Sequence, residues 1–158
     1  MNGRWLVPAM WGIGVVASVA PFGCGIPVNG TSDDCDGGSV VDGMSGTTGG
    51  PTTVSFANDI RPLFEMNGCL TSACHGGGLV SSGYNLETYA GVIGPGDAAR
   101  ALSICDVAPG EPDGSFLIEK ISNDTPRTGV RMPLNRPPLA NDEIELIRTW
   151  IAEGAMDN

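Results

Sequence analysis

The sequence predicts a small all-α domain, because three stretches carry apolar residues at helical spacing. Residues 56–64 place apolar side chains at i, i+4, i+7 and i+8, and residues 116–121 repeat a helical pattern. The third stretch is the clearest and ends at Gly154. Its apolar stripe consists of Ile144, Ile147 and Ile151, with Leu146 and Trp150 beside it. This face needs a large apolar partner, and the first helix is the natural one.

The ends of these helices follow from their flanking residues. An N-cap at Asn58 or Asp59 puts Pro62 in the first turn, where a missing N–H costs little, and the pair at residues 67–68 ends the helix. Asp113 is the expected cap of the helix over residues 116–121. A short helix is expected over residues 86–92. The last helix is expected to start near Ala140 or Asn141. The first helix should bury Phe56, Ile60, Leu63 and Phe64.

Composition divides the 158 residues into three parts. Residues 1–23 resemble an export signal, with Arg4 before an apolar run without charge. Residues 24–54, rich in Gly, Ser, Thr and Asp, are predicted to form a flexible tether. Residues 55–158 then form the single folded domain, with a size ordinary for one core.

The amino terminus predicts export to the periplasm or the cell surface. Cleavage before Cys24 is favoured, and cleavage after Ala20 and an uncleaved anchor are the alternatives. Residues 21–25 are similar to a bacterial lipobox, although Pro21 stands where a leucine-like residue is usual. The similarity implies lipidation of Cys24 and attachment to a membrane through that lipid.

The formal net charge is -10, and the chain has no basic run that would meet phosphates. Nucleic acid is therefore not an expected partner. An acidic surface favours a positively charged docking partner, if a protein partner exists.

Two cysteines and the only histidine form the strongest chemical signal. Cys69 and Cys74 are separated by four residues, and His75 follows directly. Two thiols with an adjacent imidazole predict covalent haem, although two intervening residues are usual. A disulfide between Cys69 and Cys74 and a zinc site are the alternatives. Cys35 and Cys105 are left over and can pair with each other.

Met132, in a polar loop before Pro133, is the candidate second axial ligand, because a thioether suits haem iron. The other candidates are less well placed: Met44 lies in the tether, Met66 is only three residues from Cys69, and Met156 lies beyond the last helix.

The order of these features resembles a single-haem class I cytochrome c domain of the exported bacterial kind. The resemblance rests on Cys69…Cys74-His75, the Pro-Gly-Glu-Pro-Asp-Gly-Ser-Phe-Leu segment at residues 109–117, Arg131-Met132-Pro133 and the terminal helix. It departs from the family in the two extra residues between the cysteines. It implies a fold with crossed first and last helices around one covalent haem c. It also implies thioether bonds at Cys69 and Cys74, with His75 and Met132 as axial ligands.

The resulting expectation is an electron carrier with a redox partner protein, not an enzyme. Arg127, Arg131 and Arg136 flank the ligand loop and are candidates to pair with haem propionates, or else are solvated surface arginines. The alternatives are a haem protein with an open iron site and a cofactor-free lipoprotein stapled by Cys69 and Cys74.

Overall fold

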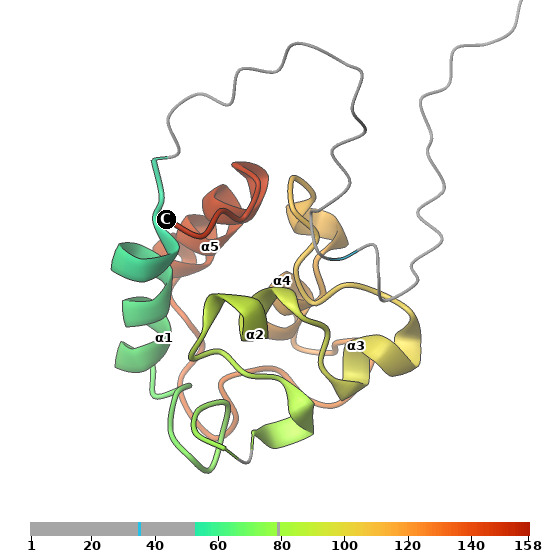
Figure 1. Ribbon diagram of the computed structural model, residues 1–158. Coiled ribbons are helices and arrows are strands. Elements are labelled where there is room, and N and C mark those ends of the chain that lie inside the picture. The colour runs from blue at the N-terminus through green and yellow to red at the C-terminus, as the bar shows by residue number, and fades with distance from the viewer. Residues whose placement is uncertain (1–34, 36–52, 79) are drawn as a thin grey trace, which may run out of the picture.

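The computed structural model describes residues 35, 53–78 and 80–158 (Figure 1). Every regular element in these residues is a helix, and no strand occurs among them, which confirms the all-α prediction. Within the same residues, no helix has the length and apolar character needed to cross a membrane. The predicted signal segment, Cys24 and nearly all of the predicted tether lie outside the described residues.

The first helix begins earlier than predicted. It opens with a π-helical turn, η1 (Phe56–Ile60), and continues as α1 (Arg61–Met66). The cap is Ser55, whose hydroxyl accepts the N–H of Asn58 at 3.2 Å, so the expected cap at Asn58 or Asp59 is wrong. Serine is itself a strong capping residue. Pro62 has no N–H to donate within the helix, and the Arg61 N–H bonds to Phe56 O across the wider turn.

The middle of the chain folds into short helices, η2 (Ser81–Gly83), α2 (Tyr89–Ile93) and α3 (Asp97–Leu102). The helix expected over residues 86–92 is shifted, because Thr88 caps it by accepting the Gly91 N–H at 3.2 Å. Sequence reasoning missed α3. Its signals are the strong helix formers at residues 97–102 and an i, i+3 ion pair between Asp97 and Arg100 at 3.2 Å.

The carboxyl-terminal half holds η3 (Pro112–Gly114), α4 (Phe116–Ser122) and α5 (Asn141–Ala152). Asp113 does not cap α4, contrary to prediction, but pairs with Arg148 of α5 at 2.6 Å. The start of α5 agrees with the prediction, since Glu143 accepts the Ala140 N–H at 2.8 Å. The acidic side chain thus satisfies a donor that the first turn leaves free.

The core lies between α5 and the first helix. These two helices lie side by side (Figure 1). The rings of Phe56 and Trp150 approach to 5.7 Å between centroids. Trp150 is fully buried and donates its Nε1–H to Met156 O at 3.0 Å, so this side chain is core, as predicted. The four side chains predicted for the buried face of the first helix are all buried: Phe56, Ile60, Leu63 and Phe64.

Two contacts lie at the amino-terminal side of the described domain. Val54 is buried, and its N–H donates to the Glu153 carboxylate at 3.1 Å. Further upstream, Cys35 is bonded to Cys105, with Cα atoms 5.5 Å apart. The two cysteines left over in the sequence therefore pair, and the predicted tether is attached to the domain at this point.

Candidate functional site

The four predicted site residues line one cavity of about 350 Å³. Cys69, Cys74 and His75 contribute from the loop after α1, and Met132 contributes from the segment between α4 and α5. Much of the remaining wall is apolar and comes from Phe64, Leu86, Phe116, Leu117, Ile121 and Leu139. The fold thus brings two thiols, an imidazole and a thioether to one apolar space.

Backbone hydrogen bonds close the cysteine loop in spite of its two extra residues. The Cys69 N–H donates to Phe64 O at 2.9 Å, and the His75 N–H donates back to Cys69 O at 2.9 Å. A Cβ at residue 76 would lie 2.0 Å from Leu70 O, so only glycine fits where these two backbone segments touch. The chain between the cysteines therefore folds back on itself, and His75 returns to a position beside Cys69.

One hydrogen bond sets the tautomer of His75. Its Nδ1 lies 2.8 Å from Tyr84 O, and a carbonyl oxygen only accepts, so Nδ1 carries the proton. The Nε2 atom then has the free lone pair that binds a metal. Tyr84 is itself fixed, because its buried hydroxyl donates to Val92 O at 2.9 Å. The ring of His75 is thus oriented by a carbonyl that no sequence motif reveals.

Cys69 and Cys74 are free thiols in the structure, and no bond joins them. Burial raises the pKa of Cys69 to about 11, the Cys74 thiol and Glu143 raise it too, and Arg136 opposes them. In the described part of the chain, no group of three or more His, Cys, Asp or Glu side chains is arranged to hold a metal ion. Structural zinc usually has four protein ligands, and these side chains do not form such a set within the described residues.

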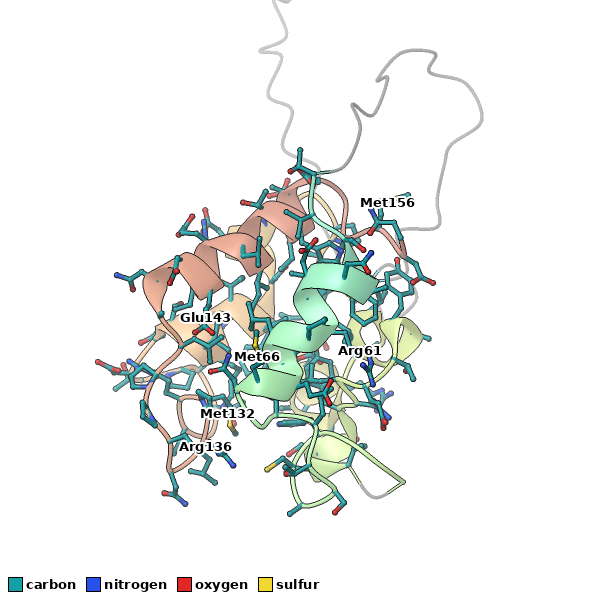
Figure 2. All side chains as sticks on the ribbon, turned by 90° about the vertical axis from the view of Figure 1, so that its left-hand side faces the viewer. Arg61, Met66, Met132, Arg136, Glu143 and Met156 are labelled. Carbon is teal, nitrogen blue, oxygen red and sulfur yellow. A yellow bond between two sulfur atoms is a disulfide. The ribbon has the colours of Figure 1, made fainter. Side chains whose placement is uncertain are left out.

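Met132 is half-buried at the cavity, and its N–H donates to Lys120 O at 2.7 Å. The competing methionines are poorly placed: Met66 is 78% exposed and Met156 is 51% exposed. Met44 lies outside the described residues. Figure 2 shows Met132 below the end of α1, with Met66 on the surface of that helix. Among the described methionines, Met132 is the one that lines the cavity.

The three candidate arginines differ in what they contact. Arg127 pairs with Glu119 at 2.6 Å, and Arg131 pairs with Asp124. Arg136 lines the cavity and forms no ion pair with any residue that the structure describes. Its guanidinium lies over Gly68, where a Cβ would come within 2.6 Å of it. Arg136 is therefore the arginine available to an anionic group at the cavity.

Asp106 is a cavity residue that sequence reasoning missed. The side chain is 4% exposed, and its Oδ2 accepts the Gly96 N–H at 2.6 Å. Burial raises the pKa of this carboxyl from 3.8 to about 6, against the Gly96 hydrogen bond and the charges of Arg100 and Lys120. The sequence gives no signal for it beyond its place after Cys105.

Comparison of the chain with known protein families, curated proteins and solved structures finds no match. The cavity and the side chains that line it are therefore the basis for a function.

Proposed function

We propose that this chain is an electron-transfer protein that carries one haem c, covalently attached through Cys69 and Cys74. The observation that carries the proposal is the shared cavity, in which two free thiols, a free Nε2 of His75 and the Met132 thioether line an apolar space. Such a donor set suits a haem iron with His/Met ligation. The all-α architecture is in keeping with a class I cytochrome c-like fold, which belongs to the proposal.

The residues around the cavity fit the chemistry of the group. The apolar walls suit a flat macrocycle and keep water away from it. Arg136, which has no ion pair within the described residues, offers a positive charge for carboxylates at the rim. Gly76 allows the loop to fold back tightly, so the thiols and His75 approach the same space.

A haem held here would carry one electron as its iron changes between the ferric and ferrous states. His75 Nε2 and the Met132 thioether would hold the iron from the protein, so the group would exchange electrons without binding a substrate at the metal. A Met ligand raises the reduction potential relative to a second His. These two ligands support an electron carrier over a haem protein with an open iron site.

The location and the partner belong to the same proposal. Export, lipidation at Cys24 and membrane attachment rest on the amino-terminal pattern. The formal net charge of -10 favours a basic redox partner. Residues 119–136 are an exception, with four basic and two acidic side chains, a net of 4 − 2 = +2.

The test is covalent attachment in the full chain, produced together with haem-attachment machinery. After acid denaturation, the parent should keep a mass increase of one haem, and C69A/C74A should keep none. C35A/C105A is the matched control, because it removes two other cysteines and should keep the haem. A parent chain without covalent haem, or with Cys69 bonded to Cys74, would sink the proposal and favour the stapled lipoprotein.

A further inference from the structure

The segment that presents Met132 has no regular structure of its own. Residues 123–140, between α4 and α5, form neither helix nor strand. A segment without an internal backbone ladder depends on bonds to the rest of the domain for its conformation. The contacts that hold residues 128–132 therefore decide where the Met132 side chain lies.

Lys120, in the last turn of α4, makes three of these contacts. Its Nζ donates to Thr128 O at 3.1 Å and also to Val130 O. Its backbone carbonyl accepts the Met132 N–H at 2.7 Å. Lys120 thus bonds to every second residue of the segment 128–132: Thr128, Val130 and the candidate ligand Met132.

The chemistry of an ammonium group suits this contact. It has three donors and no acceptor, and the segment offers converging carbonyl oxygens. Gly129 lies between the two bonded carbonyls with φ +68, and a Cβ there would come within 3.1 Å of Nζ. The turn is therefore closed tightly around the ammonium. Lys120 Nζ also lies 5.8 Å from the ring centroid of Phe116, a cavity wall residue.

The two ion pairs of this segment each have one partner that is largely exposed. Arg127, paired with Glu119, has a side chain that is 52% exposed. Asp124, paired with Arg131, is 84% exposed. Exposed pairs contribute little, because water and salt screen them. The hydrogen bonds of Lys120, in contrast, reach Val130 and the backbone N–H of Met132 itself.

We propose that Lys120 is the positioning residue for Met132: its ammonium and its carbonyl hold residues 128–132 so that the thioether stays at the cavity. The inference rests on the proposed function insofar as Met132 is an iron ligand. The part that concerns the backbone stands on the hydrogen bonds alone.

The experiment uses the full haem-loaded chain and two readouts. The first is the thioether-to-iron charge-transfer band of the ferric protein, and the second is hydrogen exchange at the Met132 amide. K120M keeps the length of the side chain but loses its donors, whereas K120R keeps charge and donors. E119Q is the matched control, since it weakens the neighbouring contact to Arg127 and leaves the three Lys120 bonds in place.

In K120M, the Met132 amide should exchange about tenfold faster or more, and the charge-transfer band should weaken. K120R should recover most of both, and E119Q should stay within about twofold of the parent. The amide of Ile147, in the core helix α5, should exchange at the parental rate in every variant, because the effect is local.

Several outcomes would overturn the inference. The first is that K120M keeps the parental charge-transfer band and the parental exchange rate at the Met132 amide. The second is that K120R is as impaired as K120M. The third is that exchange at the Ile147 amide rises as much as exchange at Met132, which would mean general unfolding. A parent without covalent haem defeats the proposed function instead. The exchange comparison between K120M and the parent then still decides whether Lys120 holds the segment.

Discussion

The Cys35–Cys105 disulfide permits a quantitative prediction about stability. Cys35 is 1% exposed and joins the upstream segment to the domain over a sequence separation of 70 residues. C35A/C105A removes this cross-link and leaves Cys69 and Cys74 in place. The change therefore tests the architecture separately from the proposed cofactor.

The magnitude follows from the length of the closed loop. A cross-link restricts the unfolded chain, and the chain-entropy model gives roughly 4 kcal/mol for a separation of 70 residues. Measured disulfides span about 0–5 kcal/mol, since strain and residual structure intervene. Domains of this kind unfold with about 5–15 kcal/mol, so the loss is a large part of the total.

The assay is urea unfolding followed by far-ultraviolet circular dichroism. With a slope of about 2 kcal/mol per molar, the midpoint of C35A/C105A should fall by roughly 2 M. Reduction of the parent disulfide should bring its curve close to that of the variant, which is the internal control. A difference below about 1 kcal/mol under oxidising conditions would contradict the predicted role of the cross-link.

Three further predictions concern single positions. G76A should lower the yield of folded protein, because the added Cβ would lie 2.0 Å from Leu70 O. G78A is the control and should behave as the parent, because a Cβ there has no neighbouring atom within 4 Å. Equal yields of folded G76A and G78A would contradict this prediction. The raised pKa of Asp106 means that the folded state holds a proton that the unfolded state releases, so its contribution to stability is present below about pH 4 and lost as pH rises through about 6. D106N keeps an acceptor for the Gly96 N–H and should raise the unfolding free energy at pH 8 by up to about 3 kcal/mol. If the unfolding free energy of D106N depends on pH in the same way as that of the parent, the raised pKa of Asp106 is refuted. D113A should lower the free energy of unfolding, measured by thermal unfolding, by no more than about 0.5 kcal/mol, because the Asp113 carboxylate forms a surface ion pair and not a helix cap. A loss of about 1 kcal/mol or more would instead indicate that Asp113 caps α4.

Apolar periodicity carried most of the prediction of the fold. The stripe of α5 and the buried face of the first helix follow a 3.6-residue period, and burial of Phe64 and Trp150 agrees with it. The helix α3 escapes prediction because it is short and directly follows Gly-Pro-Gly at residues 94–96, a pattern that is typical of a turn or a helix end. Gly94 is the C-cap of α2, and Gly96, two residues later, is the N-cap of α3.

The candidate site was predictable only in its side chains. Cys69, Cys74, His75 and Met132 could be chosen because their chemistry and order are visible in the sequence. The groups that orient them are backbone atoms: Tyr84 O for the imidazole, and the carbonyls bonded to a lysine for the methionine segment. Such partners depend on how distant segments pack, and no local pattern encodes them. The pairing of Cys35 with Cys105 was likewise only one arithmetic possibility until the fold brought the two together.

The most direct test of the proposed haem site is the absorption spectrum of the purified full chain, first ferric and then reduced with dithionite. His75 and Met132 as axial ligands predict sharp bands in the reduced protein and a thioether-to-iron band in the far red of the ferric protein, which M132A should lose. A high-spin spectrum in the parent would leave the haem in place and contradict Met132 ligation, favouring an open iron site. A colourless protein would contradict the account as a whole.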